Sequence, residues 1–551
     1  MAGNLVLPAG GGCGVDDRLS GLPEGVLEHV LSFMPAPDAV RSSVLSTRWR
    51  GAWTRAPALN LSDAPPHQDR FLGIAGAVLA RYATLDIPSL NVVIGCQSNL
   101  GPATAAWLAG AMERVVGSVS VSVTAPAPLD TLILPTRLRA KSISLTLSGI
   151  LFHHGQVVLP EPGGSTSLGG LVELSLSRVR LQEGVRPLGQ FLSSCCPQLR
   201  KLRLSQVSGG SAESGGLHLW PLVLHLDRLQ ELEVDRVESF TKMQVVSASL
   251  RVLVVRSCFD SISQWDIDTV AEISAPRLEE VSWSGKLPKH LSFLTGSGCI
   301  RRLAGLFFYL PGEEFRSTSA VRLLDMCSSA DQLSIYVDIP DYTAPSRLTR
   351  EYMEHVPQLP NIRVLSLHLF AVLRFISCPI APSFFSFLRR CPNLTRLHID
   401  LSMLHQFSRL HSDYLMVPDD NESKVAEVWQ SSDRDLCREQ LELVSLRQIR
   451  ISGFMGSYHE MELADILFGV GAARPALERI SILFPQVSQG TDGNLLYGAG
   501  ATRSPFRRLS VSFDQLRRHI DAICEKVKAQ FPLVGGSWEI KARIDLIWIK
   551  T

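Results

Sequence analysis

The sequence predicts a mixed α/β protein in which a short helical module precedes an irregular solenoid of repeats with a parallel concave sheet. Two observations support this prediction. Apolar residues near the N-terminus recur at helical spacing, and a motif of the form L-x-x-L-x-L then recurs nine times along the chain. At 551 residues the chain is also too long for one compact core, so several structural units are expected.

The helical signals lie between Asp16 and Pro57. Pro23 suits the first turn of a helix, where its missing backbone N–H is not needed. Pro35 and Pro37 end the first apolar stripe, and further short helices follow them. A unit this small buries little surface and carries more apolar side chain than three short helices can cover. It therefore either caps the following domain or docks on another protein.

Residues Asp17 to Trp53 follow the pattern D-R-L-S-x-L-P-x-x-V-L-x-x-V-L-S-F-M-P-x-x-D-A-V-R-x-S-V-L-S-x-R-W-R-x-x-W. This pattern resembles the F-box of plant F-box/leucine-rich-repeat proteins. The resemblance implies a three-helix F-box that binds a Skp-type adaptor and, through it, a cullin. It also implies a set of adaptor-binding residues, among which Val30 and Val40 combine core and contact roles. This set is Leu22, Pro23, Val30, Leu31, Pro35, Val40, Val44, Leu45 and Trp49.

The L-x-x-L-x-L segments predict strands with one buried face, because their last two apolar positions alternate with polar residues. Each repeat also has an apolar connection to cover, so stacking of repeats is expected to form an irregular leucine-rich-repeat solenoid. A doubly wound sheet is the alternative, but recurrence at nine sites favours the solenoid. The segments begin at Leu171, Leu199, Leu229, Leu250, Leu278, Ile362, Leu394, Leu446 and Leu477.

The repeats depart from the usual leucine-rich pattern in the turn that follows each strand. Asn or Cys is expected there, because its side chain satisfies main-chain groups of the turn. This chain has Cys258 at one such place, but Val179, Val207, Val237 and Phe454 at the others. We therefore expect an uneven stack with variable connections.

The C-terminal part predicts a closing repeat and a cap. The region from Cys437 to Ile482 reads as a strand, a glycine turn, an amphipathic helix and a second strand. It resembles the FBD region of many plant F-box/repeat proteins. One more helix and a strand near Trp538–Trp548 are expected to complete the cap. The predicted boundaries are a flexible tail at 1–15, the F-box at 16–57, the solenoid at 58–425, the FBD-like repeat at 426–500 and the cap at 501–551.

The sequence shows no recognisable catalytic, metal-binding or cofactor-binding constellation. It contains neither a P-loop nor a nucleophile elbow, and its 11 cysteines form no CxxC pair. With 54 basic and 53 acidic residues, it lacks the basic excess typical of nucleic-acid binding, and no window resembles a membrane span. We expect a non-enzymatic protein of the nucleus or cytoplasm, with no cofactor, no metal, no nucleic-acid partner and no membrane.

These observations lead to one leading hypothesis and two alternatives. The leading hypothesis is a substrate-receptor subunit of an SCF-type cullin ubiquitin ligase, which binds a Skp-type adaptor through the F-box and an unknown protein target through the repeats. The alternatives are a repeat-based protein-binding scaffold and a small-molecule sensor, each acting without ligase assembly. A sensor requires basic and aromatic side chains that converge across successive strands. Arg178, Arg203 and Arg236 lie beside three strands, and the sequence leaves open whether they converge.

Overall fold

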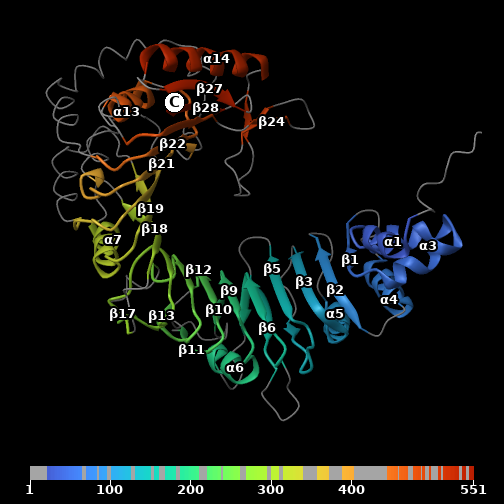
Figure 1. Cartoon of the computed structure of the whole chain (residues 1–551). Coiled ribbons are helices and arrows are strands. Elements are labelled where there is room, and N and C mark those ends of the chain that lie inside the picture. The colour runs from blue at the N-terminus through green and yellow to red at the C-terminus, as the bar shows by residue number, and fades with distance from the viewer. Residues whose placement is uncertain are drawn as a thin grey trace, which may run out of the picture. The chain divides into compact units, whose positions relative to one another are not determined.

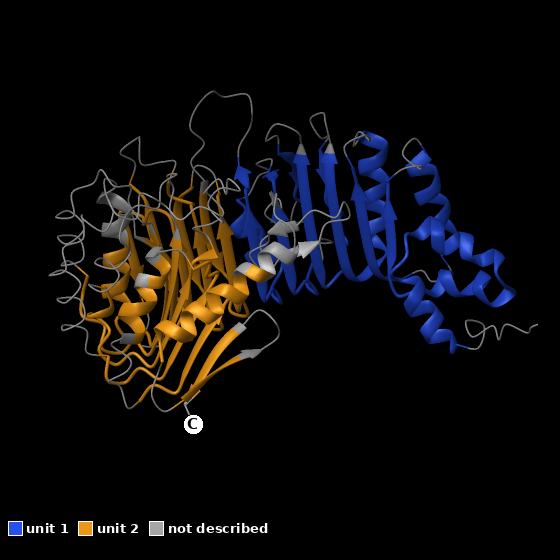
Figure 2. Ribbon diagram, turned by 90° about the horizontal axis from the view of Figure 1, so that it is seen from above, with its two compact units in different colours: residues 1–220 blue, residues 221–551 orange. Residues whose placement is uncertain are grey.

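A computed structural model of the chain divides into two compact units, residues 1–220 and residues 221–551 (Figure 2). The structure describes residues 22–64, 70–82, 86–95, 101–125, 131–149, 154–160, 168–181, 187–209, 220–237, 240–260, 268–294, 300–308, 314–338, 356–370, 387–402, 443–456, 458–469, 476–484, 487–489, 495–497, 507–509, 513–532, 536–541 and 545–550.

Unit 1 begins with a module of short helices, as the sequence predicts. These are α1 (Glu24–Leu31), α2 (Ala36–Arg41), the 3-10 turn η1 (Ser42–Val44), α3 (Thr47–Ala52) and the 3-10 turn η2 (Trp53–Arg55) (Figure 1). Pro23 precedes α1 and Pro35 precedes α2, each at a position where a helix needs no N–H donor. The Ser46 hydroxyl caps α3 by accepting a hydrogen bond from the Trp49 amide at 3.4 Å.

Parallel strands in two rows make up the rest of unit 1. Each strand of the main row pairs in parallel with the next, and so does each strand of the shorter second row. The main row is β1 (Leu59–Ser62), β2 (Ile87–Ile94), β3 (Val115–Ala125), β5 (Ser142–Gly149), β7 (Glu173–Ser177) and β9 (Lys201–Ser205). The second row is β4 (Leu132–Ile133), β6 (Gly155–Val158), β8 (Val179–Leu181) and β10 (Ser208–Gly209). The helices are α4 (Phe71–Arg81), α5 (Pro102–Glu113) and α6 (Leu188–Cys195).

Unit 2 repeats this arrangement with more strands. Its main row, parallel throughout, is β12 (Glu231–Asp235), β14 (Val252–Arg256), β16 (Glu280–Ser284), β18 (Arg302–Phe308), β19 (Gln332–Asp338), β20 (Val364–Phe370), β21 (Arg396–Asp400), β22 (Gln448–Ser452) and β23 (Arg479–Leu483). A second row contains β11 (Trp220–His225), β13 (Phe240–Val246), β15 (Val270–Ser274) and β17 (His290–Phe293). Helix α7 (Glu314–Met326) lies between β18 and β19 along the chain.

The C-terminal elements close unit 2. Helix α13 (Tyr458–Gly469) connects β22 to β23, and α14 (Phe513–Gln530) follows a small antiparallel sheet. That sheet comprises β24 (Val487–Gln489), β25 (Leu495–Tyr497) and β26 (Arg507–Leu509). The chain ends in a hairpin of β27 (Gly536–Lys541) and β28 (Asp545–Lys550), and β28 pairs antiparallel to β23. The single strand predicted near Trp538–Trp548 is therefore two strands that pair antiparallel to each other.

The main-row strands bury alternate side chains. In β12, for example, Leu232 and Val234 are buried while Glu231, Glu233 and Asp235 remain partly exposed. This alternation places the apolar core on one side of the strands, as expected for strands with one covered face. We call the opposite side, which carries the polar residues, the open face.

The structure confirms all nine L-x-x-L-x-L segments as main-row strands and the overall α/β repeat architecture. It also corrects two expectations. Strands β18 and β19 lie between the fifth and sixth predicted segments and were not predicted. Several connections expected to be helical or irregular contain second-row strands instead, because the chain between main-row strands also alternates buried and exposed side chains, as in β13 and β15.

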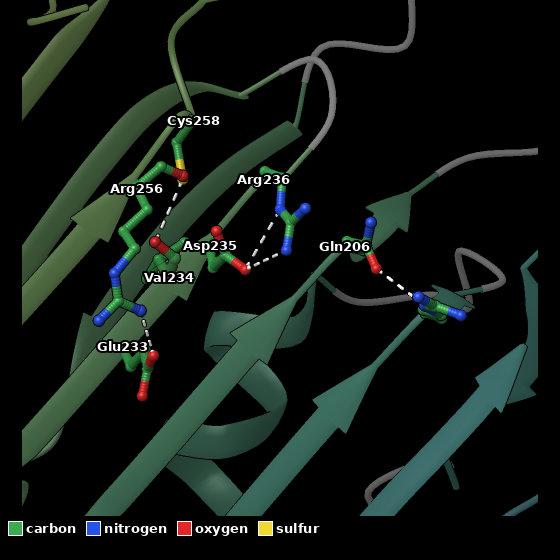
Figure 3. A network of polar contacts seen from close by, with 8 residues as sticks. Gln206, Glu233, Val234, Asp235, Arg236, Arg256 and Cys258 are labelled. Carbon is green, nitrogen blue, oxygen red and sulfur yellow. Dashed lines mark hydrogen bonds and ion pairs between the residues drawn. The ribbon is translucent and has the colours of Figure 1, made fainter. Parts of the chain in front are cut away.

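Apolar side chains fill the turn position that Asn or Cys usually occupies. Val179, Val207, Val237 and Phe454 are all buried there. Cys258 is the one residue of the usual type, and its Sγ donates to the main-chain carbonyls of its own and the preceding repeat, at 3.2 and 3.4 Å (Figure 3). The uneven stack predicted from this position is therefore packed by hydrophobic contact at most of its turns.

The residue before each of these positions has a left-handed backbone. Its φ is +54° at Arg178, +51° at Gln206, +47° at Arg236, +47° at Ser257 and +75° at Gly453. Such a φ reverses the chain direction at the end of the strand, and it costs about 1–2 kcal/mol for a residue that has a Cβ. The repeats thus share a turn geometry even where their sequences differ.

Candidate functional site

The helical module exposes a concentration of large apolar side chains. Of the ten large apolar side chains that are exposed in the described part of the chain, five lie between Val26 and Leu45. Val44 is 85% exposed, Phe33 74% and Leu45 66%, and Val26 and Val30 are exposed by 42% and 43%. Isolated exposed apolar residues are common, but a group of this kind marks an interaction surface.

The first helix is apolar on two adjacent faces. Leu27 and Leu31, four residues apart, point into the module and are fully buried. Val26 and Val30 share the same spacing on the neighbouring face, and Phe33 continues that face in the turn after α1, where its amide donates to the Val30 carbonyl at 3.2 Å. A module of this size covers only one of the two faces, so the other is left for a partner.

The predicted adaptor-binding residues fall into two groups. Two of them, Leu31 at 1% and Trp49 at 6% exposure, are buried inside the module. Leu31 lies on the inward face of α1 and Trp49 packs in the core, so their contact with a partner stays a prediction, and in this structure both side chains support the module from within. The remaining residues are exposed or partly exposed, and they are Leu22, Pro23, Val30, Pro35, Val40, Val44 and Leu45.

Val26 and Phe33 belong to the exposed surface but were not predicted as contact residues. The signal was present in the sequence, because residues 26, 30 and 33 follow the i, i+4, i+7 spacing of one helix face. From here on, the apolar F-box face means Val26, Val30, Phe33, Val44 and Leu45.

Hydrogen bonds attach the module to the first strand of unit 1. The side-chain amide of Asn60, in β1, donates to the carbonyl oxygens of Ser32 (2.6 Å) and Met34 (3.3 Å) after α1. A parallel β-bridge joins Asn60 to Pro35. The buried Tyr82 hydroxyl donates at 2.6 Å to the carbonyl of the residue that follows η2. The module therefore packs directly on the first repeat and is not a separate domain joined by a linker.

On the open face of unit 2, three rings stack across three neighbouring strands. Phe307 on β18 stacks on Tyr336 on β19 with a centroid distance of 4.6 Å, and Tyr336 stacks on His368 on β20 at 4.7 Å. The strand register places them in one row. Their spacing matches the ~4.8 Å separation of paired strands. The same row continues to Asp400 on β21, whose Oδ2 lies 3.2 Å from His368 Nδ1.

Hydrogen bonds fix the polar end of this row. His368 Nε2 lies 3.2 Å from the Ser334 hydroxyl, so both ring nitrogens of His368 have partners. Burial by itself raises the pKa of Asp400, but hydrogen bonds from His368 and Ser402 outweigh burial and lower that pKa to about 2. The Asp400 carboxylate is therefore ionised at neutral pH and hydrogen-bonds to His368 and Ser402.

The second histidine of the open face, His398, lies near the guanidinium of Arg450. Burial, and then the nearby Arg450 guanidinium, lower the pKa of His398 to about 4, so its ring is neutral at pH 7. His398 Nε2 lies 3.0 Å from the Ser452 hydroxyl. Arg396, Arg450 and Arg479 are exposed on β21, β22 and β23. The last strands of the parallel row thus each carry one exposed arginine. By register, Arg450 lies two residues before the row of the rings, and Arg396 and Arg479 lie four residues before it.

The three arginines named from the sequence do not form such a surface. Arg178 lies in the turn after β7 and donates to the Gln206 side chain at 3.0 Å. Arg203 lies within β9 and pairs in register with Ser175, three residues before Arg178. Arg236, in a turn of unit 2, donates to its neighbour Asp235 at 3.1 Å (Figure 3). Aromatic and basic residues converge instead on β18–β23.

The described residues contain no group of three or more His, Cys, Asp or Glu side chains placed to hold a metal ion. Burial raises the pKa of the Cys196, Cys258, Cys327 and Cys391 thiols to about 12, so these thiols stay protonated and are poor nucleophiles. Among the helices in the described ranges, none is long and apolar enough to cross a membrane.

Comparison with known proteins agrees with the helical module. Residues 19–58 match the F-box domain. A putative F-box/LRR-repeat protein of Arabidopsis thaliana is 35% identical over 107 residues, which are 19% of this chain and 22% of that protein. An F-box/FBD/LRR-repeat protein of the same plant is 26% identical over 181 residues, 33% of this chain and 38% of that protein. An F-box protein of that plant is 29% identical over 269 residues, 48% of this chain and 76% of that protein.

The match to the first two relatives thus spans about a fifth to two fifths of their length. Relatives with LRR and FBD in their names agree with the repeats and with the C-terminal region that resembled an FBD. Residues 19–58 thus match an F-box domain, and the chain is similar to the F-box/LRR-repeat and F-box/FBD/LRR-repeat proteins of Arabidopsis thaliana.

Proposed function

We propose that this chain is a substrate-receptor subunit of an SCF-type cullin ubiquitin ligase. The observation that carries the proposal is the apolar F-box face, which lies within the residues that match the F-box domain. F-box/LRR-repeat proteins are typically non-enzymatic adaptors. In this role the chain performs no chemistry itself and accelerates ubiquitin transfer by holding a target close to the transfer machinery.

The apolar F-box face supplies the adaptor-binding side of this function. Burying a Val-, Leu- or Phe-sized side chain contributes about 1.5–3 kcal/mol, so a few of these residues provide most of a stable contact. Val44, Phe33 and Leu45 are the three most exposed of them. The partner that fits is a Skp-type adaptor with an apolar groove, and a cullin joins through that adaptor.

The open face of the repeats supplies the target-binding side. Parallel rows of partly exposed side chains offer a broad surface whose residue types vary from strand to strand. Such variation suits recognition of one protein among many, because each strand contributes its own side chains. We also propose a nuclear or cytoplasmic location, which the buried free thiols support.

The adaptor contact is tested with two matched valine variants of the full-length protein. Val44 lies on the apolar F-box face, and Val444 is similarly exposed, at 67%, in unit 2. We expect wild-type protein to bind a purified Skp-type adaptor at micromolar concentration or below in isothermal titration calorimetry. Val44→Asp should weaken binding at least tenfold, because a carboxylate enters the apolar contact, and Val444→Asp should not change it.

Two results contradict the proposal. One is wild-type protein, folded by circular dichroism, that shows no heat of binding with the adaptor at 50 micromolar. The other is equal affinity of the two variants for the adaptor. Co-purification of a cullin with the wild-type complex but not with Val44→Asp extends the test from the adaptor to the whole ligase.

A further inference from the structure

We propose that the open face of β18–β22 binds an extended acidic segment of the target protein, with an apolar residue over the stacked rings and carboxylates over the arginines. The identity of this ligand as a degradation target rests on the proposed function. The binding event itself needs no adaptor.

The charges of the open face give the first reason. Arg396 and Arg450 have no carboxylate partner among the residues that the structure describes. At the other end of the open face of unit 2, Arg302 pairs with Glu280 at 3.5 Å and Arg256 pairs with Glu233. Among the described residues, arginines on β14 and β18 therefore pair with glutamates, whereas Arg396 and Arg450 make no such ion pair. The Asp400 carboxylate on β21 bonds to His368 and Ser402 instead. An uncompensated pair of guanidinium groups favours a ligand that carries carboxylates.

The stacked rings give the second reason. Phe307 stacks on Tyr336, and Tyr336 stacks on His368, so the ring faces between them are covered and the ring edges are left for a ligand. Ring edges carry the positive part of the aromatic quadrupole. The Tyr336 hydroxyl has no hydrogen-bond partner in the described part of the chain and remains available as a donor. The carboxylate of Asp400, in the same row, is held by His368 and Ser402. The row thus offers a ligand the Tyr336 hydroxyl and positive ring edges, whereas the ionised Asp400 carboxylate at its end repels acidic side chains and leaves them to the arginines.

The dimensions give the third reason. Five adjacent strands span four gaps of ~4.8 Å, or roughly 19 Å across the sheet. An extended peptide rises ~3.3 Å per residue, so about six residues cross from β18 to β22. The register makes this path diagonal, because Arg450 lies two residues and Arg396 four residues before the row of the rings. With an apolar side chain over Phe307 and Tyr336, two or three acidic side chains then reach Arg396 and Arg450 on a line that runs beside the Asp400 carboxylate and not over it. The surface therefore predicts the composition of the bound segment and the order of its apolar and acidic parts across the strands.

The test is a selection of displayed random heptapeptides on immobilised full-length protein, followed by fluorescence anisotropy with the best synthetic peptide. The wild type is compared with the double variant Arg396→Glu/Arg450→Glu and with Arg277→Glu. Arg277 is an exposed arginine in the turn between β15 and β16, outside the strands β18–β22 of the proposed site. We expect the wild type to enrich peptides with two or more Asp or Glu residues and one apolar residue.

The variants then locate the site. The double charge reversal should lower the affinity for the acidic peptide at least tenfold. The affinity of Arg277→Glu for the same peptide should stay within twofold of wild type. Tyr336→Phe removes one hydroxyl and should weaken binding about two- to fivefold. Raising the salt concentration from 50 to 300 mM should also weaken the wild-type complex, because the contact is mainly ionic.

Three results overturn the inference: selected peptides with no excess of acidic residues, a double variant that binds the acidic peptide as tightly as wild type, or binding of inositol hexakisphosphate at this face with no peptide selected. Adaptor binding is measured on the same samples. The double variant Arg396→Glu/Arg450→Glu should still bind the adaptor, and Val44→Asp should still bind the acidic peptide. Failure of this inference and failure of the proposed ligase role are therefore distinguishable.

Discussion

The F-box and the open face of unit 2 display opposite kinds of surface, although both arise from side chains that alternate between core and solvent. The F-box turns Phe33, Val44 and Leu45 outward, and its exposed contacts are apolar. The open face exposes charged groups, together with aromatic rings that stack on one another. Apolar area suits one constant partner, whereas a pattern of charges rejects ligands of the wrong sign. The two surfaces are thus suited to a shared adaptor and to a selected target.

The largest effect is expected when a core residue and a surface residue of the F-box are replaced separately. Trp49→Ala should cost about 3–5 kcal/mol in the free energy of unfolding of the module, because it removes a large buried side chain. Phe33→Ala should change that free energy by less than about 0.5 kcal/mol, because Phe33 is mostly exposed. Urea unfolding followed by tryptophan fluorescence measures both.

A Phe33→Ala protein that unfolds as easily as Trp49→Ala contradicts the separation into core and surface. A Phe33→Ala protein of normal stability that binds adaptor more weakly supports it. Trp49→Ala by itself is uninformative about the adaptor contact, because it alters the fold that presents the apolar F-box face.

The second prediction concerns the turns of the repeats. Gly453 has a φ of +75°, and a Cβ at this position meets the backbone N of Ser402 at 2.6 Å and its Cα at 2.8 Å. Gly453→Ala should therefore lower the melting temperature of unit 2, with a cost of about 1–3 kcal/mol. Gly76 in α4 is the control, because a Cβ added there meets nothing within 4 Å. Gly76→Ala should stabilise by up to about 1 kcal/mol, since alanine favours a helix.

Differential scanning calorimetry separates the two glycine variants. Equal melting temperatures for Gly453→Ala and wild type mean that the shared left-handed turn is not needed for stacking. A loss of stability in both variants points to a general intolerance of substitution and not to turn geometry.

The third prediction concerns the junction between the F-box module and β1, the first strand of unit 1. Asn60→Ala removes the donors to the Ser32 and Met34 carbonyls and should cost about 1–2 kcal/mol. Hydrogen exchange of the α1 amides should become faster. Asn361 makes a comparable but exposed bond to the Ser328 carbonyl at 3.0 Å, so Asn361→Ala is the control and should leave α1 exchange unchanged. Unchanged α1 exchange in Asn60→Ala shows that the F-box is anchored elsewhere.

The smallest expected effect is the pH dependence of the open face. The pKa of His398 is about 4 in the folded protein against 6.5 for the free side chain, through burial and Arg450, with His368 and Asp400 as its other charged or titratable neighbours. The unfolded chain therefore takes up this proton first as the pH falls. Stability should decline from pH 6.5 towards 4, by less than about 1 kcal/mol between pH 7.5 and 5.5 once solvent screening is considered.

His398→Gln keeps a hydrogen-bonding group but cannot titrate, so its thermal midpoint should depend less on pH than that of wild type over this range. Protonation of Asp400 affects the stability only at lower pH, because the pKa of Asp400 falls from 3.8 to about 2 on folding. Parallel curves for wild type and His398→Gln between pH 7.5 and 5 contradict the assignment.

Sequence patterns predicted the strands that keep the full leucine spacing and missed those that do not. In β18 an extra residue at Gly305 shifts the register between Leu303 and Leu306, so the last apolar position falls out of the motif. In β19 the leading position is Ala330, which is buried like a leucine but is not recognised as one. Tertiary packing accepts both replacements, because what it requires is a buried side chain and not a particular residue type.

The candidate surfaces were predicted to different extents. Exposed positions such as Val44 and Leu45 followed from the F-box pattern, but the pattern could not tell which apolar face of α1 turns inward, and so Leu31 was placed on the surface. The row of Phe307, Tyr336 and His368 was not predicted at all. Its members lie about thirty residues apart, and only the strand register brings them together.

The first strand of the repeats depends on the F-box to cover one of its edges. Within the described residues, β1 has β2 as its one strand partner, and the β-bridge from Pro35 to Asn60 lies along its other edge. An unpaired parallel edge is a template for aggregation. A shortened protein that begins after the F-box therefore exposes an unpaired strand edge. Any loss of partner binding in such a protein reports misassembly as well as loss of the F-box. Point variants on the apolar F-box face avoid this ambiguity.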